Sequence, residues 1–409
     1  MVYYDNQSKV QHVLPMNLTN QHSLQLAIVI ISCALVSIGQ LASVIYLPSL
    51  PEITHALHTN SALVGSTLTM YMFFFGISQL IGGALSDIFG RKPVILFGMT
   101  IYIVAAVSCA TAETITVLLL GRAVEGLGAG CITSVARATL NDSHSGTSLT
   151  KAIGYSSIIA SLTSMFSPTL GGLIQLISNW RFIFWCLAGY CLIIMVITIY
   201  LFEETSPWET RQKARLKDSL FHLYALNSNR QFIKYTLTAT LSFAAMSSYY
   251  VASPFMLQQG LHLSPVMYSL TFILTSAGFI TGSLINQTTI LPADRLLSIA
   301  NMIMTGSLII LTLVAGIGLF NIYTVLVPIV FMTGCIGILY PRGMSAAVAP
   351  FKHMAGSAAA VVGCAQMTFS AIGVLIMSHL PKTYPLPMAL TLTAISLMVT
   401  LIYHCMDKR

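Results

Sequence analysis

Long stretches without a charged side chain run through most of this sequence. Residues 53–86, 152–180 and 383–406 contain no Asp, Glu, Lys or Arg. Each stretch exceeds the ~20 apolar residues that a helix needs to cross a bilayer. Of the 409 residues, 56% are hydrophobic and only 8% are charged, whereas soluble domains carry about 25% charged residues. We therefore predict an all-α membrane protein.

The spacing of the charges predicts twelve transmembrane helices. Two charge-free runs, 235–293 and 296–341, are too long for one span, and short loops near Gln258–Pro265 and Gly318–Asn321 divide each into two. The other spans are expected in residues 10–51, 53–86, 93–112, 114–136, 152–180, 182–202, 353–381 and 383–406. The first ~24 residues are polar and the first apolar run reaches spanning length, so we expect no cleavable signal peptide.

Cationic residues indicate the orientation of these spans. If both termini are cytoplasmic, all of the 19 Lys and Arg residues fall on that side except Arg181, Lys382 and the membrane-embedded Arg122. This asymmetry follows the positive-inside rule and explains the formal charge of +7. Because the cations are dispersed over loops, nucleic-acid binding is not expected.

A polar segment divides six spans from six spans. We expect a cytoplasmic segment at residues 1–24, a six-helix bundle at 25–202, a cytoplasmic linker at 203–232, a second bundle at 233–405 and a tail at 406–409. Two such halves are typical of a transporter whose substrate site lies between them near the bilayer midplane. Within the linker, residues around Arg215–Leu226 are compatible with a helix on the membrane surface and with a plain tether.

One ion pair is expected at membrane depth. Of the twelve acidic residues, only Glu125 lies well inside a predicted span, and Arg122 is one helical turn away. A charge at this depth costs at least ~2.5 kcal/mol, so such residues usually mark an ion or substrate path. Glu125 and Arg122 are the candidates for proton coupling, and a static pair that holds helices together is the alternative. Arg137, near the end of the same span, is expected to extend to the membrane interface.

The loop after the second span carries a motif. It contains Gly83, Asp87, Gly90, Arg91 and Lys92 in the order G-A-L-S-D-I-F-G-R-K. Gly83 is expected to permit close helix packing, Gly90 a tight turn, and Asp87 an ion pair or a helix cap. The pattern resembles the G-x-L-a-D-r-x-G-r-k signature of the major facilitator superfamily, and this resemblance implies that the loop latches the outward-facing state.

Three further blocks strengthen this resemblance. The block from Gly121 to Gly130 looks like the R-x-x-q-G motif of the fourth span, with Glu125 in place of glutamine. Residues Ser167, Pro168, Gly171 and Gly172 resemble the G-P-x-x-G-G antiporter motif, which is expected to seal the two halves when the protein faces inward. Residues 180–185 open the sixth span as in drug-exporting members.

Two blocks resemble the Bcr/CflA branch of bacterial drug:proton antiporters. They are Tyr249–Gln258 in the seventh span and Ile45–Pro51 at the end of the first. The branch usually has an aspartate at the position of Val44. Its absence, with Glu125 gained three spans later, implies that the coupling chemistry has moved or been lost.

The resemblance also predicts which spans line a substrate cavity. They are spans 1, 2, 4, 5, 7, 8, 10 and 11. Their candidate polar, aromatic or methionine contributors are Gln40, Tyr46, Tyr71, Met165, Tyr249, Tyr250, Tyr268, Tyr340, Gln366 and Phe369.

The function expected from these features is efflux of small amphipathic compounds, drugs included, by proton antiport in a bacterial inner membrane. A dedicated exporter of a metabolite, such as a siderophore or an amino-acid derivative, is the alternative within transport. A non-transporting membrane sensor belongs to a different class, and an enzyme is not expected because no catalytic cluster is visible. We expect small-molecule substrate, protons and lipid as partners, a monomer, and no cofactor or metal, since the eight cysteines lack metal-ligand spacing.

Overall fold

The computed structural model describes residues 18–205 and 229–406, almost all of them in helices. The expected surface helix around Arg215–Leu226, most of the linker, most of the N-terminal segment and residues 407–409 lie outside the described residues. The elements of the first half are α1 (Leu18–Val44), η1 (Leu47–Ser49), α2 (Leu50–Ala56), α3 (Ser61–Phe89), α4 (Arg91–Ala110), α5 (Ile115–Ser143), α6 (Gly146–Ile177) and α7 (Trp180–Leu201).

The second half repeats this pattern of long helices. Its elements are α10 (Arg230–Pro254), η2 (Phe255–Gly260), α11 (Pro265–Thr288), α12 (Ala293–Gly316), α13 (Ile322–Val348), η3 (Ala349–Met354), α14 (Ala355–Ser378) and α15 (Pro385–Cys405). The two long charge-free runs are thus divided between α10 and α11 and between α12 and α13, as predicted.

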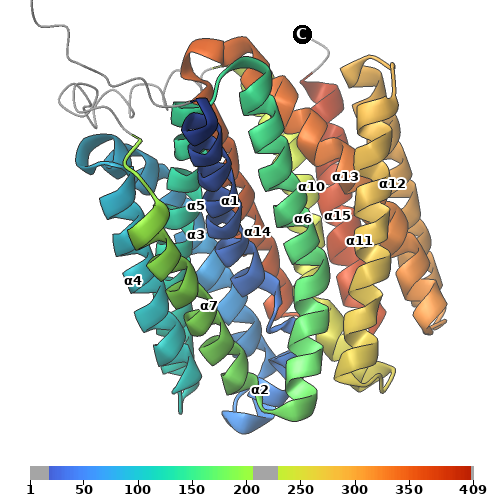
Figure 1. The fold of residues 1–409 in the computed structure, drawn as a ribbon. Coiled ribbons are helices and arrows are strands. Elements are labelled where there is room, and N and C mark those ends of the chain that lie inside the picture. The colour runs from blue at the N-terminus through green and yellow to red at the C-terminus, as the bar shows by residue number, and fades with distance from the viewer. Residues whose placement is uncertain (1–17, 206–228, 407–409) are drawn as a thin grey trace, which may run out of the picture.

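The long helices form two six-helix bundles that stand side by side (Figure 1). Within the first bundle α5 packs against α3, α4 and α1, and within the second α13 packs against α10, α11 and α12. Two helix pairs join the bundles, α3 with α14 and α6 with α11. We call the end at which α1 begins and α15 ends the terminal end, and the opposite end, where α2 lies, the far end (Figure 1).

Apolar side chains cover the outside of the bundles. Phe97, Leu120, Leu313 and Phe331 are each more than half exposed although they lie within long helices. Water-soluble monomers rarely expose apolar patches larger than a few hundred Å², whereas lipid accepts such a surface. Among the described residues, eleven helices are long and apolar enough to cross a membrane.

Helix α10 is the twelfth long helix, and its composition sets it apart. It carries Ser, Thr and Tyr along its length, and it falls short of the hydropathy of the other eleven. Most of its side chains are buried, because α13, α14 and α15 surround it. Several of its hydroxyls bond back to the helix, as when Ser248 donates to the carbonyl oxygen of Ala244 at 2.9 Å.

Candidate functional site

A large cavity lies between the two bundles. Its volume is about 670 Å³, and α1, α3, α5, α6, α10, α11, α13 and α14 all contribute to its wall. These are the eight spans from which the cavity was predicted. The lining runs from the middle of the bundles, at Tyr71 and Met246, to the terminal end, at Asn141 and Val348. The cavity therefore reaches towards the end at which the chain begins and finishes.

Five of the ten predicted contributors line this cavity. They are Gln40, Tyr71, Tyr250, Tyr340 and Gln366. The hydroxyl of Tyr340 on α13 donates to Oε1 of Gln366 on α14 at 2.6 Å, which links these two helices at the cavity wall. Gln40 Oε1 accepts a hydrogen bond from Ser164 Oγ at 3.2 Å, which links α1 to α6.

The other five contributors do not line the cavity. Tyr46 and Tyr268 point into their own bundles, where their hydroxyls meet Thr67 Oγ1 at 3.1 Å and Ser253 Oγ at 3.0 Å. Tyr249 is fully buried beside Tyr250. Met165 and Phe369 are partly buried, and neither lines the wall. The residue types were right for a cavity, but the helical face decides which of them reach it.

The predicted ion pair is present and is buried completely. Arg122 Nη1 lies 2.6 Å from Glu125 Oε2, and both side chains have no exposed surface. Arg122 also donates to the carbonyl oxygen of Ala42 on α1 at 3.1 Å. Its guanidinium carbon lies 4.5 Å from the ring centre of Tyr46 and 4.1 Å from that of Tyr71. The cation is thus held by one carboxylate, one carbonyl and two aromatic faces.

Close helix packing brings the pair to this place. A Cβ at Gly126 would collide with the backbone of Tyr71 on α3, and one at Gly128 with the backbone of Gly98 and Tyr102 on α4. The glycines of α5 therefore let it lie against both neighbours, which encloses Arg122 and Glu125. Neither residue lines the cavity, and Tyr71, which does line it, contacts Arg122.

The pair is not fully satisfied by hydrogen bonds. Glu125 Oε1, Arg122 Nε and the hydroxyl of Tyr102 are all buried, and none has a hydrogen-bond partner among the described residues. Most buried polar groups in proteins are hydrogen-bonded, so an exception at a membrane-embedded acid marks a site of interest.

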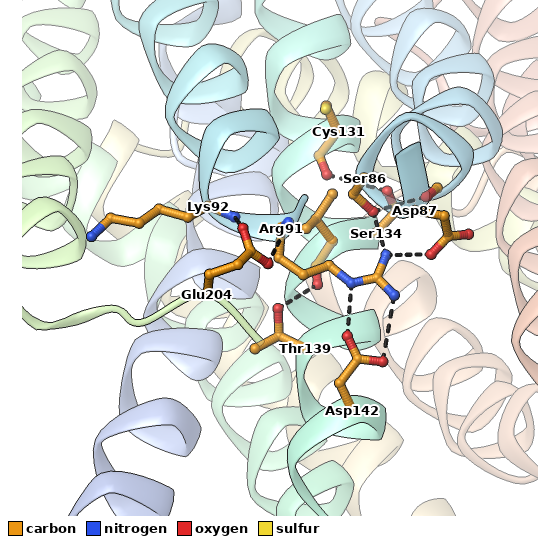
Figure 2. A network of polar contacts seen from close by, with 11 residues as sticks. Ser86, Asp87, Arg91, Lys92, Cys131, Ser134, Thr139, Asp142 and Glu204 are labelled. Atoms are coloured by element: carbon orange, nitrogen blue, oxygen red, sulfur yellow. Dashed lines mark hydrogen bonds and ion pairs between the residues drawn. The ribbon is translucent and has the colours of Figure 1, made fainter. Parts of the chain in front are cut away.

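The loop after α3 forms a network at the terminal end of the first bundle (Figure 2). Asp87 Oδ1 lies 2.6 Å from Arg91 Nη1, and Arg91 also binds Asp142 on α5, with Nε 2.8 Å from Oδ2. The Glu204 carboxylate accepts from the backbone nitrogens of Arg91 at 2.9 Å and Lys92 at 3.2 Å. The network therefore ties α3, α4, α5 and the end of α7 together within one bundle.

Two glycines of this loop behave differently. Gly90 has φ = 97°, a left-handed conformation that favours glycine, and it forms the tight turn that was predicted. Close packing at Gly83 is not observed, because nothing lies within 4 Å of the place of its Cβ. The preceding Gly82 makes the close contact instead, against Cys131 and Ser134 of α5.

The antiporter-like block lies near the far end, where the bundles touch. A Cβ at Gly171 would collide with the carbonyl oxygen of Ile45, and one at Gly172 with Ser269 and Pro265 of α11. Pro168 lies inside α6, and Ser167 donates to the carbonyl oxygen of Thr163 one turn earlier.

Two polar contacts close the same end between the bundles. Gln258 Nε2 donates to the carbonyl oxygen of Pro48 at 2.8 Å, and Lys382 Nζ donates to Ser61 Oγ at 3.2 Å. The cavity is thus closed at the far end in this conformation.

The chain matches the sequence model of the Major Facilitator Superfamily over residues 31–402. The chain belongs to the major facilitator superfamily. It is therefore a transporter and not an enzyme, and the twelve long helices in residues 18–205 and 229–406 form the two six-helix bundles of the major facilitator fold.

Curated relatives in this superfamily extend over most of the chain. Multidrug resistance protein D of Escherichia coli (strain K12) is 29% identical over 375 residues, which cover 90% of this chain and 92% of that protein. The uncharacterized MFS-type transporter YdgK of Bacillus subtilis (strain 168) is 28% identical over 366 residues, 87% of this chain and 89% of that protein. Multidrug resistance protein MdtL of Escherichia fergusonii is 28% identical over 353 residues, 84% of this chain and 86% of that protein. These relatives agree with the resemblance to a drug-exporting branch.

Solved major facilitator structures share the fold at lower identity. A partially occluded inward-open conformation of the xylose transporter XylE from E. coli superposes with a TM-score of 0.73 at 11% identity, covering 94% of this chain and 98% of that one. An inward-facing, occupied bacterial homologue of the human lysosomal transporter Spinster gives a TM-score of 0.72 at 13% identity, covering 96% of this chain and 98% of that one.

Two important residues of this major facilitator protein were missed or misread in the sequence. Arg137 was expected at the membrane interface, but it lies on the cavity wall. Asp142 was not singled out, although it binds Arg91. The position of Arg137 along α5 predicts its depth but not the helix face on which it lies. Arg91 and Asp142 are 51 positions apart in the sequence, so their contact was not visible there.

Proposed function

We propose that this protein exports small amphipathic compounds from the cytoplasm by alternating access, with protons as the counter-ions. The cavity is the observation that carries the proposal. It is closed at the far end, reaches towards the terminal end, and has a volume of about 670 Å³, within the ~300–1,000 Å³ of small-molecule sites. Its wall mixes Phe, Met and Tyr with Ser, Thr and Gln side chains, which suits ligands that have both apolar and polar parts.

The proposal places both termini in the cytoplasm of a bacterial cell and the protein in the inner membrane. The cavity then opens to the cytoplasm, from which an exporter loads. Accessibility of single-cysteine reporters in intact cells tests this orientation. Reporters at Thr59 and Tyr384 should react with a membrane-impermeant reagent added outside, and one at Arg215 should not. The opposite labelling pattern would contradict the proposal.

Glu125 is the proposed proton carrier, with Arg122 as its partner. It is the only fully buried acid among the described residues. A carboxylate shielded from water takes up a proton more readily when its ion pair weakens. We infer that a movement of α1 or α3 weakens the pair, because Arg122 is held by a carbonyl of α1 and by the ring of Tyr71 on α3.

The remaining features of the proposal concern the change of conformation. The Asp87 loop would stabilise the outward-facing state, and the close contact of Gly172 with α11 would seal the far end against proton leak in the inward-facing state. One chain supplies every wall of the cavity, which supports a monomer as the working unit. The limits 25–202 and 233–405 remain our proposal for the two moving bodies.

Proteoliposomes with an imposed pH gradient provide the test. Amphipathic dyes that are cationic, neutral or anionic are offered, and their transport is measured with and without the gradient. An Ala160→Trp variant should block transport because Ala160 lines the cavity. Leu313→Trp, on the exposed surface of α12, is the matched control and should transport normally. Gradient-independent or absent transport of every dye would contradict the proposal.

A further inference from the structure

The wall of the cavity carries a single charged side chain. Among the described residues that line it, Arg137 is the only Lys or Arg, and no Asp or Glu lines it. The two acids on the same helix do not line the wall: Asp142 is paired with Arg91, and Glu125 is fully buried and paired with Arg122. The charge that faces a ligand in this cavity is therefore positive.

The side chain of Arg137 extends from the first bundle to the second. Arg137 belongs to α5, yet its Nη1 lies 3.8 Å from the place of a Cβ on Gly363 of α14. It forms no ion pair or hydrogen bond with any other residue in the described part of the chain. The guanidinium therefore lies beside a helix of the other bundle, on the wall of the cavity.

The surroundings of Arg137 leave its charge uncompensated. Gln79 Oε1 also packs against Gly363 and is a buried acceptor without a hydrogen-bond partner, but an amide oxygen is neutral. The Tyr340 hydroxyl, also on the wall, donates to Gln366 Oε1. That bond leaves the amide nitrogen of Gln366 as a further donor in the wall.

The chemistry of a guanidinium defines the group that it would bind. Its planar, permanently charged fork matches the two oxygens of a carboxylate. Low-dielectric walls strengthen its attraction for anions and its repulsion of cations. Deeper in the cavity lie Phe279, Met246 and Tyr250, which offer an apolar surface to the remainder of a ligand.

We propose that the substrates of this protein are amphipathic carboxylates, and that Arg137 binds the carboxylate while the apolar body lies deeper, towards Tyr71. The inference rests on the proposed function, since it names the substrate class of the same cavity. It makes Arg137 a residue that determines specificity, distinct from the buried pair of Arg122 and Glu125.

Three probes that share one ring system test the charge preference. They are 1-naphthaleneacetate, 1-naphthaleneacetamide and 2-(1-naphthyl)ethylammonium, and their binding to the purified full-length protein in nanodiscs is measured by calorimetry. The wild type should bind the carboxylate at least tenfold more tightly than the amide and should bind the ammonium most weakly. An ammonium that binds as tightly as the carboxylate would overturn the inference.

Substitutions then assign the preference to one residue. Arg137→Gln should remove the preference for the carboxylate while amide binding stays within twofold, which also shows that the variant is folded. Arg137→Lys should keep part of the preference, because it retains the charge but not the fork. The control is Arg342→Gln, since Arg342 lies at the same end but off the wall, where it donates to the carbonyl oxygen of Leu291 at 3.0 Å. A carboxylate preference that survives Arg137→Gln, or one that Arg342→Gln removes equally, would overturn the inference.

Transport assays separate this inference from the proposed function. If Arg137-dependent carboxylate binding is found but no probe is transported against a gradient, the specificity holds and the export function fails. If the amide is exported but the charge preference does not depend on Arg137, export holds and the specificity fails.

Discussion

The Arg122 guanidinium lies 4.1 Å from the ring centre of Tyr71, and Tyr71 is itself part of the cavity wall. The Tyr71 hydroxyl donates to the carbonyl oxygen of Gly39 on α1 at 2.8 Å. This hydrogen bond holds the Tyr71 ring against the ion pair at the cavity wall. A ligand that moves Tyr71 therefore acts on the partner of Glu125 without touching the acid. Substrate binding and proton binding would thus both depend on the position of Tyr71.

Glu125→Gln should abolish transport driven by a pH gradient while substrate binding survives. The change keeps the size of the side chain but removes its titration, and the acid does not line the cavity. The measurement is proton release when substrate is added to the detergent-solubilised protein, wild type against variant. Equal release from both proteins would place the proton elsewhere, and no release from either would indicate a carrier that is not coupled to protons.

Arg122→Ala should destabilise the protein more than the double change Arg122→Ala with Glu125→Ala. Breaking a buried pair by removing one partner costs roughly 3–5 kcal/mol because a buried charge loses its compensation. The double variant leaves no uncompensated charge. Thermal unfolding in detergent of both single variants and the double variant gives the coupling free energy. Additive effects of the two changes would mean that the pair does not hold α5 in place.

Asp142→Asn should lower the unfolding temperature more than Asp87→Asn. Both carboxylates bind Arg91, but the Asp142 side chain is 23% exposed and that of Asp87 is 45% exposed. A contact shielded from water is less screened, so its loss costs more. Asp87→Asn should instead shift the protein towards inward-facing conformations, as measured by spin-label distances across the terminal end. Unchanged distances would argue against a latch at Asp87 in this protein.

Gly172→Ala should weaken closure of the far end. Its new methyl group would meet Ser269 and Pro265 of α11, so the bundles would have to separate. Gly154→Ala in the same helix is the control, because nothing lies within 4 Å of the place of its Cβ. Spin labels at Thr111 and Leu319 should report a longer distance only in Gly172→Ala. The same distance in both variants would show that this contact does not set the closed state.

Closure of the far end should strengthen as the pH rises from about 8 to about 10.5. Lys382 is buried between the bundles, and this burial lowers its pKa from 10.5 to about 8. When the end opens, Lys382 meets water and binds its proton at the ordinary pKa, so the open state holds more protons within this window. Below pH 8 the lysine is charged in both states and the effect is absent.

The Thr111–Leu319 distance, followed from pH 7 to pH 10.5, measures this dependence. Lys382→Met should remove the dependence, and Lys151→Met, at the terminal end, should leave it intact. A pH dependence that persists in Lys382→Met would assign it to another group.

The fold was predictable because lipid imposes a simple rule on sequence. Charged residues are excluded from the bilayer core, so the charges that remain mark the ends of the helices. The loops before Pro265 and before Ile322 carry no charge, and they were located because the charge-free runs 235–293 and 296–341 are too long for one span. The pair of Arg122 and Glu125 was predictable because residues three apart on a helix lie on one face.

The candidate site was less predictable because a bundle uses each face of a helix differently. Tyr249 and Tyr250 are adjacent, yet Tyr250 lines the cavity and Tyr249 does not. Helix α5 packs closely against Gly82 and not against Gly83. Arg137 has the depth of an interfacial arginine, and only the rotation of α5 turns it towards the cavity. These outcomes depend on how helices are rotated in the assembled bundle, and periodicity alone does not specify that rotation.

Helix α10 has a consequence for how the protein is made. Its Ser, Thr and Tyr side chains make it the least apolar of the twelve long helices in the described part of the chain. Transfer of the isolated helix into lipid would therefore be only weakly favourable in free energy. Its place depends on α13, α14 and α15, which the ribosome completes later. Stable insertion of α10 must therefore await the last third of the chain. Reporter fusions that truncate the protein just after Pro254 would then misreport its topology, although the full-length chain is correctly inserted.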